Sequence, residues 1–204
     1  PTDPGDGVDQ AALDGGLLAL SPGCPIRDSS WHGMHVTGTI NASTDNGLGV
    51  ASVAPGVKVE PVRVLGRCGG FTSDIVDAIV WASGGTVAGV PDNANPADVI
   101  NMSLGSQQAC TNSYQTAIDA AVASGTTVVA AGGNSNVDVA GASPASCNNV
   151  IAVGAIGEDG KRADFSNYGA GIDLSAPGDL IASTTNAGLL GPGADNYMFM
   201  SGTS

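Results

Sequence analysis

Apolar and polar positions follow two different periods along the middle of the chain. Residues 59–65, 99–104, 126–131 and 150–156 form short apolar runs with the length and β-branched content of strands. Between them, residues 72–81 and 114–123 place apolar side chains three and four positions apart, which predicts helices. Strands alternating with helices through short links predict an α/β domain with a mainly parallel sheet covered by helices.

The two ends of the chain lack this alternation. Residues 1–30 are rich in Asp, Gly and Pro and predict an acidic loop region with one short helical turn near residues 11–20. Residues 172–200 contain short β-like segments divided by Pro177, Gly178 and further glycines. Nothing marks a linker between two domains, so we expect residues 1–204 to form a single domain.

The charge balance excludes several classes of partner. The chain contains six Lys and Arg residues and nineteen Asp and Glu residues, which gives a net charge of −13. Binding to nucleic acid depends on clustered basic residues, and so does binding to an anionic membrane surface. No apolar run reaches the length of about 18 residues that a spanning helix needs. We therefore expect a protein that binds neither nucleic acid nor membrane. We also expect it to be a monomer.

The four cysteines lie far apart, and no two of them form a CxxC pair. They are Cys24, Cys68, Cys110 and Cys147. An even number at wide spacing favours two disulfides formed in an oxidising compartment, and the alternative is four buried thiols. Zinc-knuckle and thioredoxin-like motifs have no support.

Chemistry is expected at the carboxyl ends of the strands, where open α/β sheets gather their sites. The loops that follow residues 65, 104 and 131 all begin with small residues. The third of these loops runs Gly132, Gly133, Asn134, and an Asn amide after two glycines can donate to an oxyanion. Taken alone, these glycines are also compatible with ordinary turns.

Only two histidines occur, His32 and His35, at the start of a short predicted helix. A metal site at this HxxH pair lacks a third histidine and an HExxH glutamate. A structural role and a general-base role both remain open from the residues alone. The general-base interpretation gains weight from the terminal Ser204, because a serine hydroxyl needs an adjacent base to become a nucleophile.

Taken in order, seven strings resemble the subtilisin-like serine proteases, the subtilase family, from about residue 30 to the end of the chain. The strings are HGMHVTGTI, GVASVAP, VRVLGRCGG, NMSLGS, VVAAGGN, the stretch SPASCNNVIAVGAI with DFSNYG and LSAPG, and SGTS. The resemblance implies a three-layer fold with a mainly parallel sheet flanked by helices, truncated here at both ends. It also implies a secreted serine endopeptidase that acts on polypeptides.

The resemblance assigns roles to individual residues. It makes His32 the general base, Ser204 the nucleophile and Asn134 the side-chain donor to the oxyanion, and it leaves His35 structural. An extended peptide would pair with two backbone strips. The first strip contains Gly69 and Gly70, and the second contains Ser103, Leu104 and Gly105. The pocket for the residue before the scissile bond would lie between the second strip and Ala131, Gly132 and Gly133. Neither wall is acidic, so a small or apolar residue is expected there.

The chain departs from the family pattern in three ways. Subtilases place an Asp strand before the histidine, and none of the acidic positions upstream of His32 follows an apolar run. The chain also ends on Ser204, and Met34 stands where the family usually has Thr. We therefore expect an internal segment of a longer enzyme, inactive when isolated. A naturally inactive peptide-binding module on the same fold is the alternative, and an acyl-transfer enzyme for non-peptide esters fits the peptide-pairing strips less well.

Calcium is the one cofactor that the sequence suggests. Asp3 and Asp6 lie in a turn-rich loop with hard oxygen ligands, although a solvated acidic loop explains them equally. Resemblance to the proteinase K branch adds a second candidate, in which Asp173 meets the backbone carbonyls of Asn148 and Val150. The same resemblance favours the disulfides Cys24–Cys68 and Cys110–Cys147.

Overall fold

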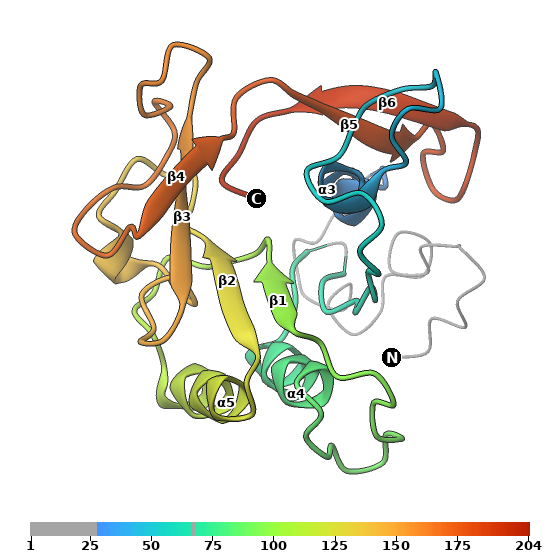
Figure 1. Cartoon of the computed structure of the whole chain (residues 1–204). Helices are drawn as coiled ribbons and strands as arrows, with labels where there is room; N and C mark the ends of the chain where they lie inside the picture. The colour runs from blue at the N-terminus through green and yellow to red at the C-terminus, as the bar shows by residue number, and fades with distance from the viewer. Residues whose placement is uncertain (1–27, 67) are drawn as a thin grey trace. The chain divides into compact units, whose positions relative to one another are not determined.

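The computed structural model describes residues 28–66 and 68–204 (Figure 1). The chain forms two compact units. The first unit contains residues Pro1–Phe71 and Ala182–Phe199, and the second contains Thr72–Ile181 and Met200–Ser204. The helical turn predicted near residues 11–20 lies outside the described residues.

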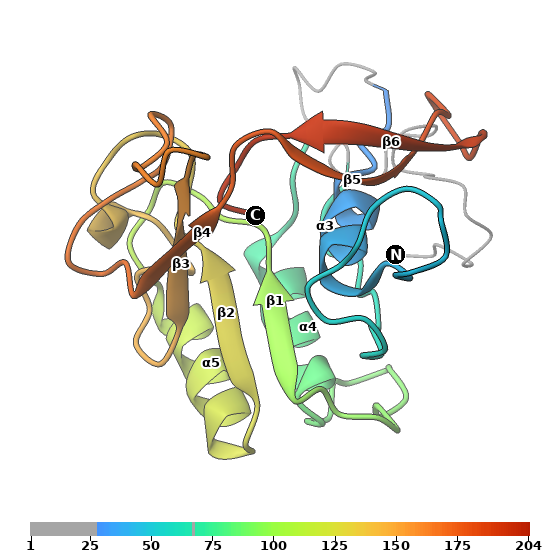
Figure 2. The same cartoon turned by 45° about the horizontal axis from the view of Figure 1, so that its top comes forward.

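A parallel sheet forms the centre of the second unit. Its strands are β1 (Val99–Met102), β2 (Thr127–Ala131), β3 (Ile151–Ile156) and β4 (Leu174–Pro177), in the order β1-β2-β3-β4. All three pairings are parallel. Helices α4 (Thr72–Ala82) and α5 (Asn112–Ala123) lie on one face of this sheet (Figure 2). The predicted α/β fold with a mainly parallel sheet is therefore confirmed.

Helix α5 shows why the sequence forms this layer. Its buried residues are Tyr114, Ala117, Ile118 and Ala121, spaced so that they share one face of the helix. The helix begins before the predicted residue 114 because Thr111 caps it, accepting a hydrogen bond from the Tyr114 N–H at 3.4 Å. Between β2 and β3 the connection contains only a short 3₁₀ turn, η1 (Val139–Gly141).

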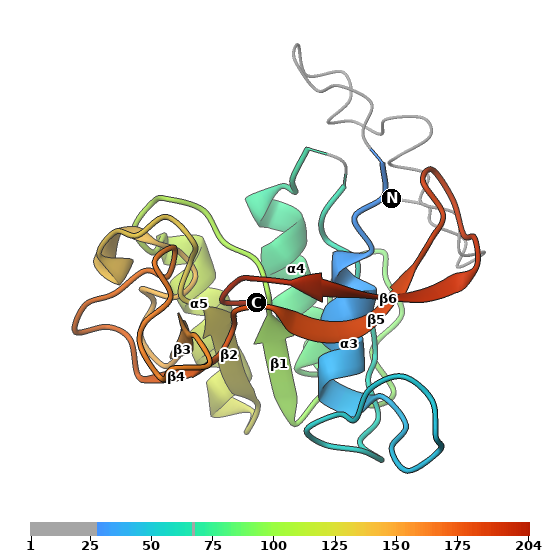
Figure 3. The ribbon, with the colours of Figure 1, turned by 90° about the horizontal axis from the view of Figure 1, so that it is seen from above.

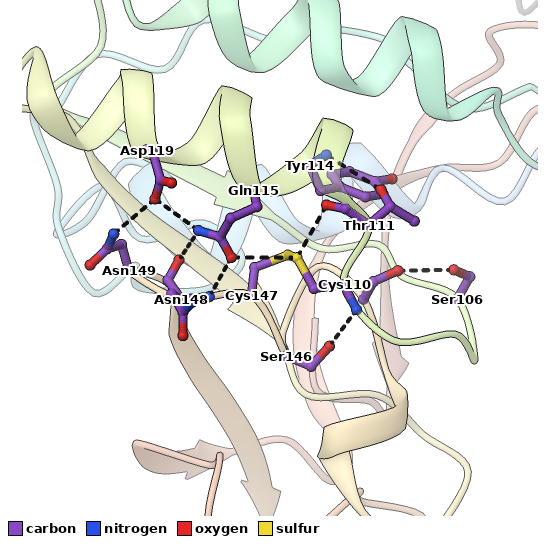
Figure 4. Close-up of a disulfide and its surroundings, with 11 residues drawn as sticks. Ser106, Cys110, Thr111, Tyr114, Gln115, Asp119, Ser146, Cys147, Asn148 and Asn149 are labelled. Atoms are coloured by element: carbon purple, nitrogen blue, oxygen red, sulfur yellow. Dashed lines mark hydrogen bonds between the residues drawn. A yellow bond between two sulfur atoms is a disulfide. The ribbon is translucent and has the colours of Figure 1, made fainter.

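One disulfide joins the two loops that flank this layer. Cys110, before α5, is bonded to Cys147, before β3, as predicted (Figure 4). Beside it, the Gln115 amide donates to the Asn148 carbonyl at 3.1 Å and accepts from the Asn148 N–H at 2.9 Å. Cys68 is also disulfide-bonded, so the alternative of four thiols is wrong. Its predicted partner, Cys24, lies outside the described residues.

Replacing both cysteines of this pair, Cys110→Ala with Cys147→Ala, is expected to destabilise the protein. The disulfide closes a loop with a sequence separation of 37 residues, for which the chain-entropy model gives about 4 kcal/mol. Urea unfolding measures the change. Reduction of the double variant should then lower its stability less than reduction of the wild type. Equal midpoints for the wild type and the double variant would contradict the prediction.

In the part of the first unit that the structure describes, one helix packs with a two-stranded sheet. Helix α3 (His32–Asn41) lies beside β5 (Ile181–Asn186) and β6 (Asp195–Met200), and Figure 3 shows it crossing both strands. The Ser183 hydroxyl donates to the His35 carbonyl at 2.7 Å. Gly38 permits this close packing, because the hydroxyls of Ser183 and Thr184 occupy the space that a side chain would fill.

The strand predicted at residues 59–65 is wrong. In the described part of the first unit this segment forms no strand, and Val62 and Leu65 remain 40% and 39% exposed. Apolar alternation forms a strand only where a neighbouring strand supplies hydrogen bonds. Pro61 also removes one donor from the segment. Across residues 28–66 and 68–204, no helix has both the length and the apolar content needed to cross a membrane.

Candidate active site

The segments that follow β1 and β2 leave the sheet side by side. Met102 stands opposite Ala130 in the parallel register. The strip Ser103, Leu104, Gly105 therefore begins next to the strip Ala131, Gly132, Gly133 and Asn134, at the carboxyl ends of the strands. Both strips belong to the second unit, and the sequence predicted both.

Packing requires glycine at two positions of the second strip. A Cβ atom at Gly132 would lie 2.8 Å from the Ile172 side chain and 3.0 Å from the Val153 carbonyl. Gly133 has a φ of +106°, and the side-chain amide of Asn167 occupies the space where its Cβ would stand. These glycines are therefore fixed by close contacts rather than by turn preference alone.

The last residues of the chain fold onto this edge of the sheet. The Asn134 Oδ1 atom accepts two hydrogen bonds from Thr203, one from its backbone N–H and one from its hydroxyl, both at 2.8 Å. The Thr203 hydroxyl oxygen in turn accepts from the Gly133 N–H at 3.0 Å. Thr203 is 8% exposed. It locks the orientation of the Asn134 amide, a role that the sequence reasoning missed.

Ser204 is held beside the same residues. Its carbonyl accepts a hydrogen bond from the Ser103 hydroxyl at 2.8 Å. The preceding Gly202 donates its N–H to the Gly178 carbonyl at 2.8 Å. A side chain at Gly202 would press on the Asn134 amide, since its Cβ would lie 3.1 Å from Nδ2. The second unit thus brings together the predicted residues Ser103, Gly133, Asn134 and Ser204.

The orientation of the Asn134 amide follows from chemistry. A backbone N–H can only donate, so the atom that faces the Thr203 N–H must be the amide oxygen. The Nδ2 group then points away from Thr203, on a side chain that is exposed to solvent. This arrangement can donate a hydrogen bond to a negatively charged oxygen that forms next to Ser204.

His32 belongs to the first unit, where it is the first residue of α3. It follows Trp31, whose backbone has a φ of 50° and whose indole N–H donates to the Gly188 carbonyl at 2.6 Å. Burial, and to a smaller extent the neighbouring His35 imidazole, lower the pKa of His32 below its ordinary value. The ring is therefore neutral at pH 7 and available to accept a proton.

The lowered pKa of His32 gives a testable pH dependence. As the pH falls below about 6.5, the unfolded chain binds a proton at this ring before the folded chain does. His32 therefore contributes stability above that pH, which is lost as the pH falls. An NMR titration should place the His32 ring below its ordinary pKa. His35→Gln should raise the His32 pKa, and a wild-type pKa of about 6.5 or above would show that burial does not act on this ring.

His35 is 4% exposed, and its Nε2 atom lies 3.2 Å from the Met198 carbonyl of β6. This placement supports the structural role that the resemblance implies. A metal site at the two histidines gains nothing from their surroundings. Among the described residues, no three His, Cys, Asp or Glu side chains gather in a way that would hold an ion.

The strip around Gly69 and Gly70 also lies in the first unit. Gly66 and Gly69 exchange two backbone hydrogen bonds, at 2.8 Å and 3.3 Å. Both backbone groups of Gly69 are therefore engaged within its own loop. A carbonyl oxygen can accept two hydrogen bonds, so the Gly69 carbonyl can still accept from a peptide, and the pairing with Gly69 and Gly70 that the resemblance implies stays a prediction.

The calcium candidates stay predictions. Asp173 Oδ2 accepts from the Ala152 N–H at 2.8 Å, and the Asn148 carbonyl accepts from Gln115 at 3.1 Å. A carboxylate and a carbonyl oxygen that each accept one hydrogen bond can still coordinate an ion, and calcium completes its six to eight oxygen ligands with water. Asp3 and Asp6 lie outside the described residues. A stabilising calcium ion therefore stays a prediction, and EDTA should lower the midpoint of thermal unfolding if it is right.

Comparisons with known proteins identify the family of this chain. The family model described as the subtilase family matches residues 19–204. The chain is 55% identical to an extracellular protease of Xanthomonas campestris pv. campestris, covering 98% of this chain and 35% of the relative. It is 50% identical to an extracellular basic protease of Dichelobacter nodosus, and this match covers 100% of this chain and 33% of that relative. The chain thus spans about a third of the length of these relatives.

A solved structure gives the same result for the fold. It is titled as proteases from Pseudoalteromonas arctica and superposes with a TM-score of 0.86 at 50% identity, covering 89% of this chain and 57% of that one. The proteases of Xanthomonas campestris and Dichelobacter nodosus are both named as extracellular. The predicted secretion is confirmed by these names.

Proposed function

Because the chain belongs to the subtilase family, we propose that it forms the catalytic core of a secreted serine endopeptidase that cleaves extended polypeptides. One observation carries the proposal. The hydrogen bonds between Asn134 and Thr203 hold a carboxamide donor next to the backbone of Ser204. A serine beside an oriented amide donor is the arrangement that acyl transfer needs.

In the proposed mechanism His32 takes the proton of the Ser204 hydroxyl as the serine oxygen attacks the carbonyl carbon of the peptide. Negative charge develops on the carbonyl oxygen, and the Asn134 Nδ2 group and the Ser204 backbone N–H donate to it. The protonated His32 then gives its proton to the leaving amine, which leaves an acyl-enzyme ester on Ser204. Water, deprotonated by His32, hydrolyses that ester and restores the serine.

The substrate is proposed to be an extended peptide with a small or apolar residue before the cleaved bond. The strip Ser103, Leu104, Gly105 and the strip Ala131, Gly132, Gly133 begin side by side and contain no charged residue. Backbone pairing along such a strip tolerates many sequences. An apolar side chain between uncharged walls needs no compensating charge, in contrast to Lys or Arg.

The third member of the triad is the open point of this mechanism. An Asp that orients the imidazole is expected upstream of the histidine, and no upstream Asp in the sequence follows an apolar run. We therefore propose that the chain of 204 residues has little peptidase activity by itself. The product of the whole reading frame that encodes it should be active.

The test is covalent labelling with a fluorophosphonate, a reagent that reacts with activated serines. The product of the whole reading frame should hydrolyse casein and carry one label, mapped by peptide mass to Ser204. Peptide binding with neither label nor hydrolysis would instead identify the inactive binding module. Labelling of Ser204 with hydrolysis of esters but not of peptides would identify an enzyme for non-peptide esters.

A further inference from the structure

We propose that Asn167 is the positioning residue for the oxyanion donor Asn134. The inference rests on the proposed function, since it assigns to Asn134 the role described above. Asn167 is 2% exposed, so it is shielded from substrate and can influence the reaction only through the residues that it holds. The sequence alone does not indicate a role for Asn167.

Asn167 contacts the loop of Asn134 on both sides of that residue. On the near side its Nδ2 group donates to the Gly132 carbonyl at 2.8 Å, and its backbone N–H donates to the Gly133 carbonyl at 2.9 Å. On the far side its Oδ1 atom accepts from the N–H groups of Ser135, at 3.1 Å, and Val137, at 3.2 Å. Both sequence neighbours of Asn134 are thus fixed by Asn167.

Only an amide side chain of this length makes these bonds together. A carboxylate would supply the acceptor but not the donor, and a hydroxyl lacks the two separate ends. The amide also fills the space beside Gly133 that a side chain at that position would take. Gly133 and Asn167 therefore form a matched pair, in which the missing side chain of one makes room for the amide of the other.

The position of the Asn134 amide matters more than its presence. A donor stabilises the oxyanion only when it stands at the correct distance, and a misplacement of about 1 Å can cost about 100-fold in rate. Two sets of bonds fix this amide: Thr203 holds its oxygen, and Asn167 holds the backbone on either side. Sites of this kind depend on the residues that support the reacting groups.

The test is a double-mutant cycle in the product of the whole reading frame. Asn167→Ala should lower kcat by about 10- to 100-fold and change KM by less than about threefold, because the oxyanion forms only in the transition state. In the Asn134→Ala background the same substitution should change kcat by less than about twofold, since the donor that it positions is gone. A merely structural role would give the same loss in both backgrounds.

Thr126→Val is the matched control. Thr126 is 5% exposed, and its hydroxyl donates to the Ala97 carbonyl at 2.8 Å, next to the amino end of β2 and away from Asn134. It should lower the thermal midpoint with kcat unchanged. If Asn167→Ala does not fold, Asn167→Asp is measured instead: Asp keeps the acceptor for Ser135 and Val137, but a carboxylate oxygen then faces the Gly132 carbonyl in place of the amide donor. The kcat of Asn167→Asp should fall by less than 100-fold, roughly the cost of a misplaced donor. In the Asn134→Ala background, Asn167→Asp should again change kcat by less than about twofold.

The outcomes separate the two proposals. If Asn134→Ala leaves kcat unchanged, the proposed role of Asn134 is wrong and the inference falls with it. If Asn134→Ala lowers kcat as expected but the loss from Asn167→Ala is independent of it, the proposed function stands and the inference is overturned. A rise in KM with unchanged kcat after Asn167→Ala would also overturn it.

Discussion

Ser204→Ala is expected to lower kcat by about 10⁶-fold, a scale taken from subtilisin itself rather than worked out for this chain. The substitution removes the atom that forms the acyl-enzyme, so the remaining rate comes from binding and from the oxyanion donors alone. The measurement is hydrolysis of a chromogenic peptide by the product of the whole reading frame, with the active enzyme concentration fixed by titration of the wild type.

Two comparisons make this prediction specific. Ser113→Ala removes an exposed hydroxyl on α5 and should leave kcat unchanged. The double variant Ser204→Ala with His32→Ala should be no slower than Ser204→Ala alone, because a base without its nucleophile contributes nothing further. A double variant slower by several orders of magnitude would show that His32 acts on some group other than Ser204.

Asn134→Ala is expected to lower kcat by about 10²–10³-fold with KM nearly unchanged, again on the scale known for loss of this donor in subtilisin. The amide group contacts an oxygen that is charged only in the transition state, so substrate binding is spared. Steady-state kinetics on a peptide substrate separate the two constants.

Asn134→Asp distinguishes a donor from a structural residue. The carboxylate keeps an acceptor for the two bonds from Thr203 and loses both N–H donors. If the amide is an oxyanion donor, Asp should be at least as harmful as Ala, because a negative charge would face the developing oxyanion. Near wild-type activity of Asn134→Asp would show that residue 134 serves only to hold Thr203.

The regular elements could be predicted wherever burial decides the pattern. Helix α5 repeats its apolar residues at helical spacing and is buried on that face. Strand β3 is a continuous apolar run between two neighbouring strands. Residues 59–65 have a similar pattern but form no strand, because a strand also depends on a partner strand that the segment's own residues do not specify.

The chemistry of the site could be predicted in part. Ser103, Asn134 and Ser204 are named by short strings, and parallel topology explains why the first two lie at one edge. The roles of Thr203 and Asn167 were not predicted, because they depend on contacts with residues that lie 69 and 32 positions away in the sequence. A polar residue shows its role only when its partners are known, whereas an apolar residue at regular spacing shows it directly.

Strand β1 has a consequence for extension of the parallel sheet. Among the described residues of its unit, β1 pairs with β2 along one side and no strand pairs with its other side. Its four residues contain no charge and no proline, and Val99 is 57% exposed. An edge of this kind can accept a further strand, and its length of four residues limits the number of hydrogen bonds that the added strand can make. We therefore expect this edge to be the place where the sheet can be extended, with room for no more than a short added strand.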